Sequence, residues 1–250
     1  MDLKGKTALI TGGSRGIGRA TALYLAKCGA NVIINYLNSY EEAESLKNLI
    51  IEKYHVNAIC INCDVCLEDE VKLMVDKAIN VFGHIDILVN NAGIALDSLF
   101  FDVKKEDFMK VLETNLVGPY LLTKYVGPHM IENKYGKIVN VGSNNGLDCY
   151  YKESVIYDAS KSGLVSLTHN TSNALAPFVN VNMVALGWVN TDMNKDLDEE
   201  QINNENNKIL LNRFADKEEI AKVIAFLVSD DASYVNDAII RVDGGIKHEF

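Results

Sequence analysis

The sequence alternates short β-branched runs with longer segments of helical periodicity, and this alternation constrains its fold most. Residues 15–28, 41–54, 68–82, 108–133, 155–175 and 217–229 carry apolar side chains at helical spacing. The runs with strand composition are TALIT, NVIINY, NAICIN, DILVNN, KIVNVGS, VNVNMVAL and AIIRVDGG. The pattern predicts a single α/β domain with a doubly wound sheet of about seven parallel strands and helices on both faces.

One segment departs from this alternation. Residues 190–212 are rich in Asn, Asp and Glu and show no clear apolar periodicity. We expect them to form a mobile substrate lid within a domain that spans residues 1–250, because ligands of such sheets bind at the carboxyl ends of the strands.

Composition limits the classes of protein to which this chain of 250 residues can belong. A formal net charge of −10 and only four arginines argue against nucleic-acid binding, because phosphate recognition needs a basic face. No apolar run reaches the roughly 18 residues of a membrane-spanning helix, and the N-terminus lacks a secretory pattern. Five cysteines, an odd number, fit a reducing compartment. We therefore expect a cytoplasmic protein that contacts neither nucleic acid nor membrane.

Three cysteines, Cys60, Cys63 and Cys66, recur at a spacing that metal-binding thiolates also use. The run NAICINCDV is predicted to be a strand, however, and successive side chains of a strand face opposite sides of the sheet. Cys60 and Cys63 should therefore point apart, and we expect no metal site.

A glycine-rich loop, TGGSRGIG from Thr11 to Gly18, follows the first predicted strand and runs directly into a helix. Glycines let the backbone turn tightly and approach a pyrophosphate, while free amides at the helix N-terminus favour the phosphate charge. The loop is predicted to hold a mononucleotide or dinucleotide, although the same spacing also occurs in turns that bind nothing.

The glycine loop resembles that of the short-chain dehydrogenase/reductase family, whose pattern is TGxxxGxG. Further matches follow in the family's order: Asn90-Asn91-Ala92-Gly93 after the fourth strand, Asn115 in the next helix, Ser143 ending the fifth strand, and Tyr157-x3-Lys161 in a later helix. The resemblance covers almost the whole chain and implies a Rossmann-type, nicotinamide-dependent oxidoreductase that forms a homotetramer. Tyr120 and Lys124 have the same spacing but no serine to join them, so we expect them to be structural.

The resemblance implies a catalytic set of Asn115, Ser143, Tyr157 and Lys161. Hydride delivered to a carbonyl carbon leaves an alkoxide that must receive a proton, and Tyr157 is the expected donor. Lys161 lies one helical turn further on, where its charge can favour a phenolate whose ordinary pKa is about 10. Ser143 would hydrogen-bond the substrate oxygen. For Asn115, a structural role and a role in the family's water relay remain equal alternatives.

Cofactor choice depends on the residues after the second strand. Members that prefer NAD place an acidic residue there, whereas this chain has Asn35-Tyr36, and Arg15 is placed to pair with a 2′-phosphate. We expect NADP(H), with NAD(H) as the alternative; Asn38 can assist, and Asp64 either contacts the adenine or merely caps the next helix. The expected cofactor-binding residues are Gly12, Ser14, Arg15, Gly16, Ile17, Gly18, Asn35, Tyr36, Asp64, Val65, Asn91, Ala92, Gly93, Tyr157, Lys161, Gly187, Val189 and Thr191.

The whole pattern, including the final VDGG, most resembles the 3-oxoacyl-[acyl-carrier-protein] reductases, which implies reduction of a carrier-bound β-keto thioester. Lys134 and Lys137 are candidates for a basic docking patch, and solvated surface lysines explain them equally well. Leu186 replaces a common proline and Asp237 a usual glycine of the family. The alternatives are a reductase or dehydrogenase of a sugar, polyol or small ketone, and a non-catalytic dinucleotide-binding sensor.

Overall fold

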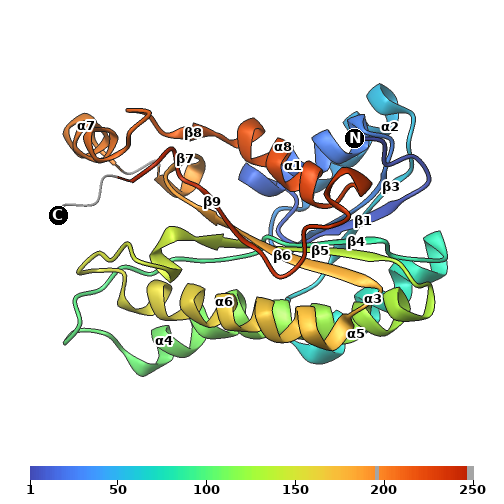
Figure 1. The fold of residues 1–250 in the computed structure, drawn as a ribbon, viewed down its shortest axis with the longest axis horizontal. Coiled ribbons are helices and arrows are strands. Elements are labelled where there is room, and N and C mark those ends of the chain that lie inside the picture. Colours follow the sequence, from blue (N-terminus) through green and yellow to red (C-terminus); the bar gives the residue numbers. More distant parts are fainter. Residues whose placement is uncertain (195–196, 247–250) are drawn as a thin grey trace.

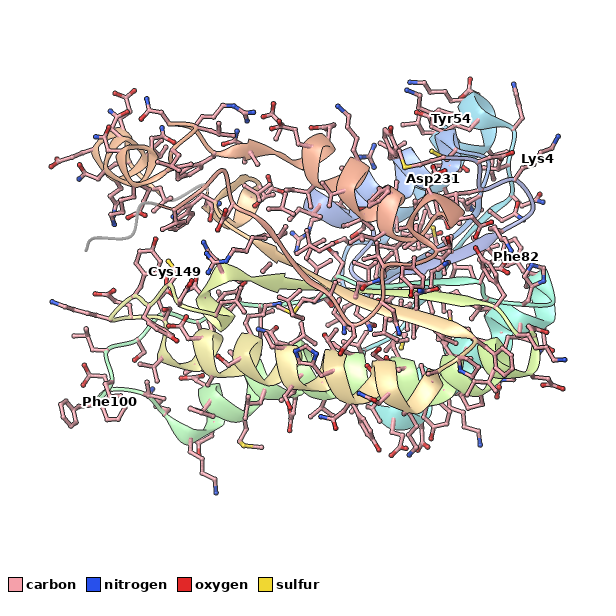
Figure 2. All side chains as sticks on the ribbon, in the orientation of Figure 1. Lys4, Tyr54, Phe82, Phe100, Cys149 and Asp231 are labelled. Atoms are coloured by element: carbon pink, nitrogen blue, oxygen red, sulfur yellow. The ribbon has the colours of Figure 1, made fainter. Side chains whose placement is uncertain are left out.

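A parallel sheet lies at the centre of the computed structural model, which describes residues 1–194 and 197–246 (Figure 1). Its strand order is β3-β2-β1-β4-β5-β6-β9, so the direction of winding reverses between β1 and β4, where doubly wound sheets bind ligands. The strands are β1 (Thr7–Ile10), β2 (Asn31–Tyr36), β3 (Ala58–Asn62), β4 (Ile87–Asn90), β5 (Gly136–Ser143), β6 (Val179–Leu186) and β9 (Ile239–Val242). The predicted fold class is confirmed.

Helices cover both faces of this sheet (Figure 1). One layer contains α1 (Gly16–Lys27), α2 (Tyr40–Tyr54) and α8 (Lys217–Leu227), and the other contains α3 (Glu68–Phe82), α4 (Lys105–Leu112), α5 (Gly118–Glu132) and α6 (Val155–Leu175). Because both faces are covered, consecutive strand residues are apolar: Leu9 and Ile10 are both fully buried, in different core clusters. Cys60 and Cys63 likewise pack on different clusters, as the alternation predicted.

The segment predicted as one helix over residues 108–133 is divided by a π-helical turn, Glu113–Val117, between α4 and α5. Pro119 has no N–H to donate to the carbonyl of Asn115, so the regular α-helical ladder cannot continue there. The wider turn places Asn115 in the protein interior.

Residues 190–212 contain more regular structure than predicted. The short strands β7 (Val189–Asn190) and β8 (Ala215–Asp216) pair in parallel, and α7 (Glu199–Lys208) lies apart from the two main helical layers (Figure 1). A capping box starts α7, since Asp198 accepts from the Gln201 backbone at 2.8 Å and the Gln201 side chain accepts in return at 3.0 Å. Residues 195–196 of the expected lid lie outside the described part of the chain. None of the described helices is long and apolar enough to cross a membrane.

Candidate active site

Thr11 joins the carboxyl ends of β1 and β4. Its Oγ1 accepts hydrogen bonds from the backbone N–H groups of Asn91 at 2.9 Å and Ala92 at 3.0 Å. The Asn91 side chain donates in return to the carbonyls of Thr11 at 2.9 Å and Gly12 at 3.1 Å. The glycine loop and the Asn-Ala-Gly segment, both expected to bind cofactor, therefore lie together at one edge of the sheet.

Because its glycines have no side chains, the loop leaves room for a ligand and packs closely on the neighbouring backbone. A Cβ on Gly12 would lie 3.1 Å from the Ala92 Cα, and one on Gly18 would lie 2.3 Å from the Gly12 carbonyl oxygen. Gly16, with φ of 52°, begins α1, whose N-terminal amides receive no side-chain cap from Arg15. Free amides at a helix start are suited to a pyrophosphate, so the loop fits a dinucleotide.

The residues expected to contact the adenosine end of the cofactor differ in their exposure and hydrogen bonds. Arg15 is exposed and Tyr36 half-buried beside the loop. Asn35 is buried, accepting from the Gly12 N–H at 3.2 Å and donating to the Cys63 carbonyl at 3.0 Å, so its side chain supports the loop from inside. Asp64 accepts from the Cys66 N–H at 2.9 Å and so stabilises the turn before α3. It does not cap α3, whose N-cap is Leu67.

The segment after β6 reaches the same edge of the sheet. A Cβ on Gly16 would lie 3.8 Å from Thr191 Cγ2, which places Thr191 beside the glycine loop. Gly187 has no room for a side chain, because a Cβ there would lie 2.8 Å from the Cβ of Asp243. Leu186, at the family's proline position, is buried at the end of β6.

Ser143, Tyr157 and Lys161 converge where β5 ends and α6 begins. The Lys161 Nζ lies 5.5 Å from the centroid of the Tyr157 ring and donates to the Val141 carbonyl at 2.9 Å. Ser143, the last residue of β5, lies close enough to the Tyr157 phenol to lower its pKa. A phenol, a hydroxyl and an amine at the ligand-binding edge can together donate a proton to a substrate oxygen.

Burial shifts the pKa values of Tyr157 and Lys161 in opposite directions. It raises the pKa of Tyr157 to about 12, with a smaller lowering by the Ser143 hydrogen bond and a further rise from the charge of Asp158. It also lowers the pKa of Lys161 to about 8. Tyr157 is thus a neutral phenol at neutral pH, able to donate its proton.

Asn115 faces the same group from the π-helical turn. Its amide accepts from the Ile94 N–H and donates to the Ile94 carbonyl, each at 2.9 Å, and donates to Ser160 Oγ at 3.0 Å. A Cβ on Gly93 would lie 3.3 Å from Asn115 Oδ1 and 3.8 Å from Lys161 Nζ. The structural contacts of Asn115 are therefore present, and they connect the loop after β4, the π-helical turn and α6.

Lys134 and Lys137 do not form a docking patch beside the site. Lys137 is only 4% exposed and donates to Asn180 Oδ1 at 2.8 Å. Lys134 precedes β5 and Lys137 is its second residue, so both lie at the opposite end of the strand from Ser143. The buried Lys137 is not a solvated surface lysine, whereas Lys134 is exposed. Sequence position alone did not distinguish the two ends of the sheet.

One cluster near the site was missed by sequence reasoning. The Glu205 carboxylate of α7 accepts from the Tyr151 hydroxyl at 2.8 Å and from the Trp188 Nε1 at 3.0 Å. The indole also stacks on Phe214, with ring centroids 5.3 Å apart. The cluster thereby connects α7 to the loops after β5 and β6. A single Trp directly after Gly187 was the available signal.

Comparison with known proteins agrees with this geometry. Residues 12–247 match the family described as Enoyl-(Acyl carrier protein) reductase. The 3-oxoacyl-[acyl-carrier-protein] reductase FabG of Aquifex aeolicus is 40% identical over 245 residues, covering 98% of both chains. The corresponding FabG of Staphylococcus epidermidis is 38% identical, covering 96% of this chain and 98% of that protein.

Solved structures give the same family. A mutant short-chain dehydrogenase/reductase of Serratia marcescens superposes with a TM-score of 0.93 at 32% identity, covering 98% of this chain and 99% of that one. A short chain dehydrogenase of Burkholderia cenocepacia in complex with NADP superposes with a TM-score of 0.92 at 32% identity and the same coverage.

Proposed function

Because this chain belongs to the short-chain dehydrogenase/reductase family, we propose that it is an NADP(H)-dependent reductase of 3-oxoacyl thioesters carried by an acyl carrier protein. The carbonyl chemistry is supported by one observation: Ser143, Tyr157 and Lys161 converge beside a dinucleotide-fitting glycine loop. The substrate class is supported by the identity of 38–40% to 3-oxoacyl-[acyl-carrier-protein] reductases over nearly the whole chain. The unpaired cysteines fit a cytoplasmic location.

The proposed mechanism assigns one task to each side chain. The bound nicotinamide would supply a hydride to the carbonyl carbon. Ser143 hydrogen-bonds the carbonyl oxygen, and Tyr157 donates its phenolic proton to that oxygen as negative charge develops. Lys161, with its ammonium beside the phenol, stabilises the phenolate that remains. Asn115 holds the Gly93 segment beside Lys161 through its bonds to Ile94, and the family's water relay at this residue stays the alternative role.

The test of this function is oxidation of NADPH, and separately of NADH, by the purified protein with acetoacetyl-CoA as a carrier-free thioester. Turnover with NADPH is the expected result. NADPH binding without thioester turnover would instead favour the sugar, polyol or small-ketone reductase. Asp97 and Glu153 support that alternative, because their exposed carboxylates lie close enough to interact and would repel an acidic carrier protein. No binding of either cofactor would exclude both reductases.

Charge reversal at Arg15 tests the cofactor preference. The exposed guanidinium at the start of α1 can pair with a 2′-phosphate, which NADPH has and NADH lacks. Arg15→Glu is therefore expected to raise the Kd for NADPH about tenfold or more, equivalent to roughly 1.4 kcal/mol, with little change for NADH. Fluorescence titration with each cofactor measures the ratio, and an equal loss for both would contradict the assignment.

The segment 190–212, whose residues 195–196 are not described, would act as a substrate lid through α7. Glu205→Gln removes the carboxylate that accepts from Tyr151 and Trp188. Since Trp188 is the only tryptophan, its fluorescence reports this contact directly. We expect altered emission and about a two- to fivefold higher KM for the thioester, consistent with loss of a charge-assisted hydrogen bond. Glu200→Gln, on the exposed start of α7, is the control, and identical spectra for the two variants would contradict the lid contact.

A homotetramer is proposed through the face formed by α5 and α6. A shallow apolar groove there is lined by Leu116, Val117, Tyr120 and Leu167, and Val117 and Tyr120 are exposed. Sedimentation that gives only monomer at micromolar concentration would exclude this assembly.

A further inference from the structure

The end of β5 carries a hydrogen-bonded pair that the mechanism above does not use. Asn145 follows Ser143 by two residues in the 3-10 turn Asn144–Gly146, and its side chain is buried. Its Nδ2 donates to Asp158 Oδ1 at 2.7 Å and to Ser154 Oγ at 3.4 Å. Asp158, only 8% exposed, directly follows Tyr157 in α6. A buried carboxylate therefore follows the proposed proton donor in the chain, close enough for its charge to act on the phenol.

Asn145 contacts the Ser143 hydroxyl through two groups. Its backbone N–H donates to Ser143 Oγ at 3.2 Å, and its Oδ1 accepts from the hydroxyl at 3.2 Å. Because the Asp158 carboxylate only accepts hydrogen bonds, it must face the Nδ2 of Asn145 and leaves Oδ1 directed at Ser143. When the serine proton turns to a substrate oxygen, the backbone bond remains and polarises the hydroxyl as a donor.

We infer that Asn145 and Asp158 are positioning residues of the proposed reduction: Asn145 orients the Ser143 hydroxyl, and Asp158 holds Asn145 while placing a negative charge beside Tyr157. The inference rests on the proposed function. It assigns to this chain a charge that favours the protonated phenol and so opposes the charge of Lys161, which favours the phenolate.

The charged groups around Tyr157 shift the ionisation of its phenol in opposite directions. Lys161, on the same helix, favours the phenolate, with its Nζ 5.5 Å from the ring centroid. Asp158 raises the pKa of the phenol. Beyond it lie Asp97, from the loop after β4, and Glu153, from the loop before α6; partial burial and the charges of Glu153 and Asp158 raise the pKa of Asp97. Asp158 is the carboxylate that acts directly on Tyr157.

Asp158→Asn separates charge from geometry, because an asparagine oxygen can still accept from Asn145. With the negative charge gone, the phenol should ionise at lower pH. We expect the pKa of the phenol to move down by about half a pH unit or more, since nearby like charges shift a pKa by this order. The ultraviolet absorption of phenolate, taken as the difference from the same protein carrying Tyr157→Phe, should appear at correspondingly lower pH. Glu153→Gln is the matched control for a neighbouring charge and should shift the profile less.

Asn145→Ala tests the orienting contact, because it removes Oδ1 and keeps the backbone N–H. Loss of one orienting contact should lower kcat about tenfold or more, with the KM for NADPH unchanged. Unchanged thermal unfolding and NADPH affinity would exclude a folding defect, and a kcat within twofold of wild type would overturn the orienting role. A thermally destabilised Asn145→Ala would be replaced by Asn145→Asp with Asp158→Asn, which exchanges the groups and should restore kcat toward wild type.

Different results would refute the proposed function and the inferred roles of Asn145 and Asp158. If wild-type protein reduces no thioester or ketone, the proposed function fails, and the phenolate titration still decides the inference without turnover. A phenolate titration that Asp158→Asn shifts no more than Glu153→Gln does would overturn the charge role.

Discussion

Tyr157→Phe is expected to lower kcat/KM for thioester reduction by about 10³-fold, within the range of about 10²- to 10⁴-fold that general acid catalysis contributes. The substitution removes one hydroxyl and keeps the ring, so the Kd for NADPH should stay within about twofold, which is less than about 0.4 kcal/mol. Steady-state kinetics and cofactor titration of the same preparation measure both quantities.

Tyr120→Phe is the matched control for this result. Tyr120 has the same spacing to Lys124 as Tyr157 has to Lys161, but its side chain is 47% exposed and Lys124 pairs with Glu68 instead. Its kcat/KM should equal that of wild type. A Tyr157→Phe variant that keeps more than a tenth of the wild-type rate would remove Tyr157 from the role of proton donor.

The elements that the sequence predicted well are those whose apolar faces are buried. The bounds of α3 and α6 agree with the predicted helices at both ends, because their inward faces contact the core at helical spacing. In contrast, α7 buries no residue fully, so no apolar period could reveal it. Its signal was the capping box of Asp198 and Gln201, a local pattern that a search for apolar periods does not detect.

The site was predictable where a motif carries the chemistry and unpredictable where contacts join distant segments. Ser143, Tyr157 and Lys161 were selected by their resemblance to the family's motif, and the fold brings them together. The amide of Asn145 reaches Asp158 only because the turn after β5 folds back onto the start of α6. Nor could sequence show that Asn35 faces inward, since the residue types at a strand end do not reveal which way each side chain points.

Gly18→Ala is expected to disrupt the cofactor loop by steric overlap alone. A methyl group there would lie 2.3 Å from the Gly12 carbonyl oxygen and 2.6 Å from Asn91 Nδ2, so α1 must move away from the end of β1. Overpacking of this kind costs about 1–3 kcal/mol, which for a chain of this length lowers Tm by about 2–4 °C per kcal/mol. We also expect the Kd for NADPH to rise about 100-fold, because the same movement breaks the Asn91 bonds that hold the loop.

Gly83→Ala separates this effect from backbone strain. Gly83 directly follows α3 with φ of 80°, and an added Cβ there would meet no atom within 4 Å, so alanine is strained by about 1–2 kcal/mol without overlap. Both variants should lower Tm, whereas only Gly18→Ala should weaken NADPH binding. Equal NADPH affinity in the two variants would mean that close packing of α1 on the loop is not what holds the cofactor, and the fit of the dinucleotide to this loop would then lose its main support.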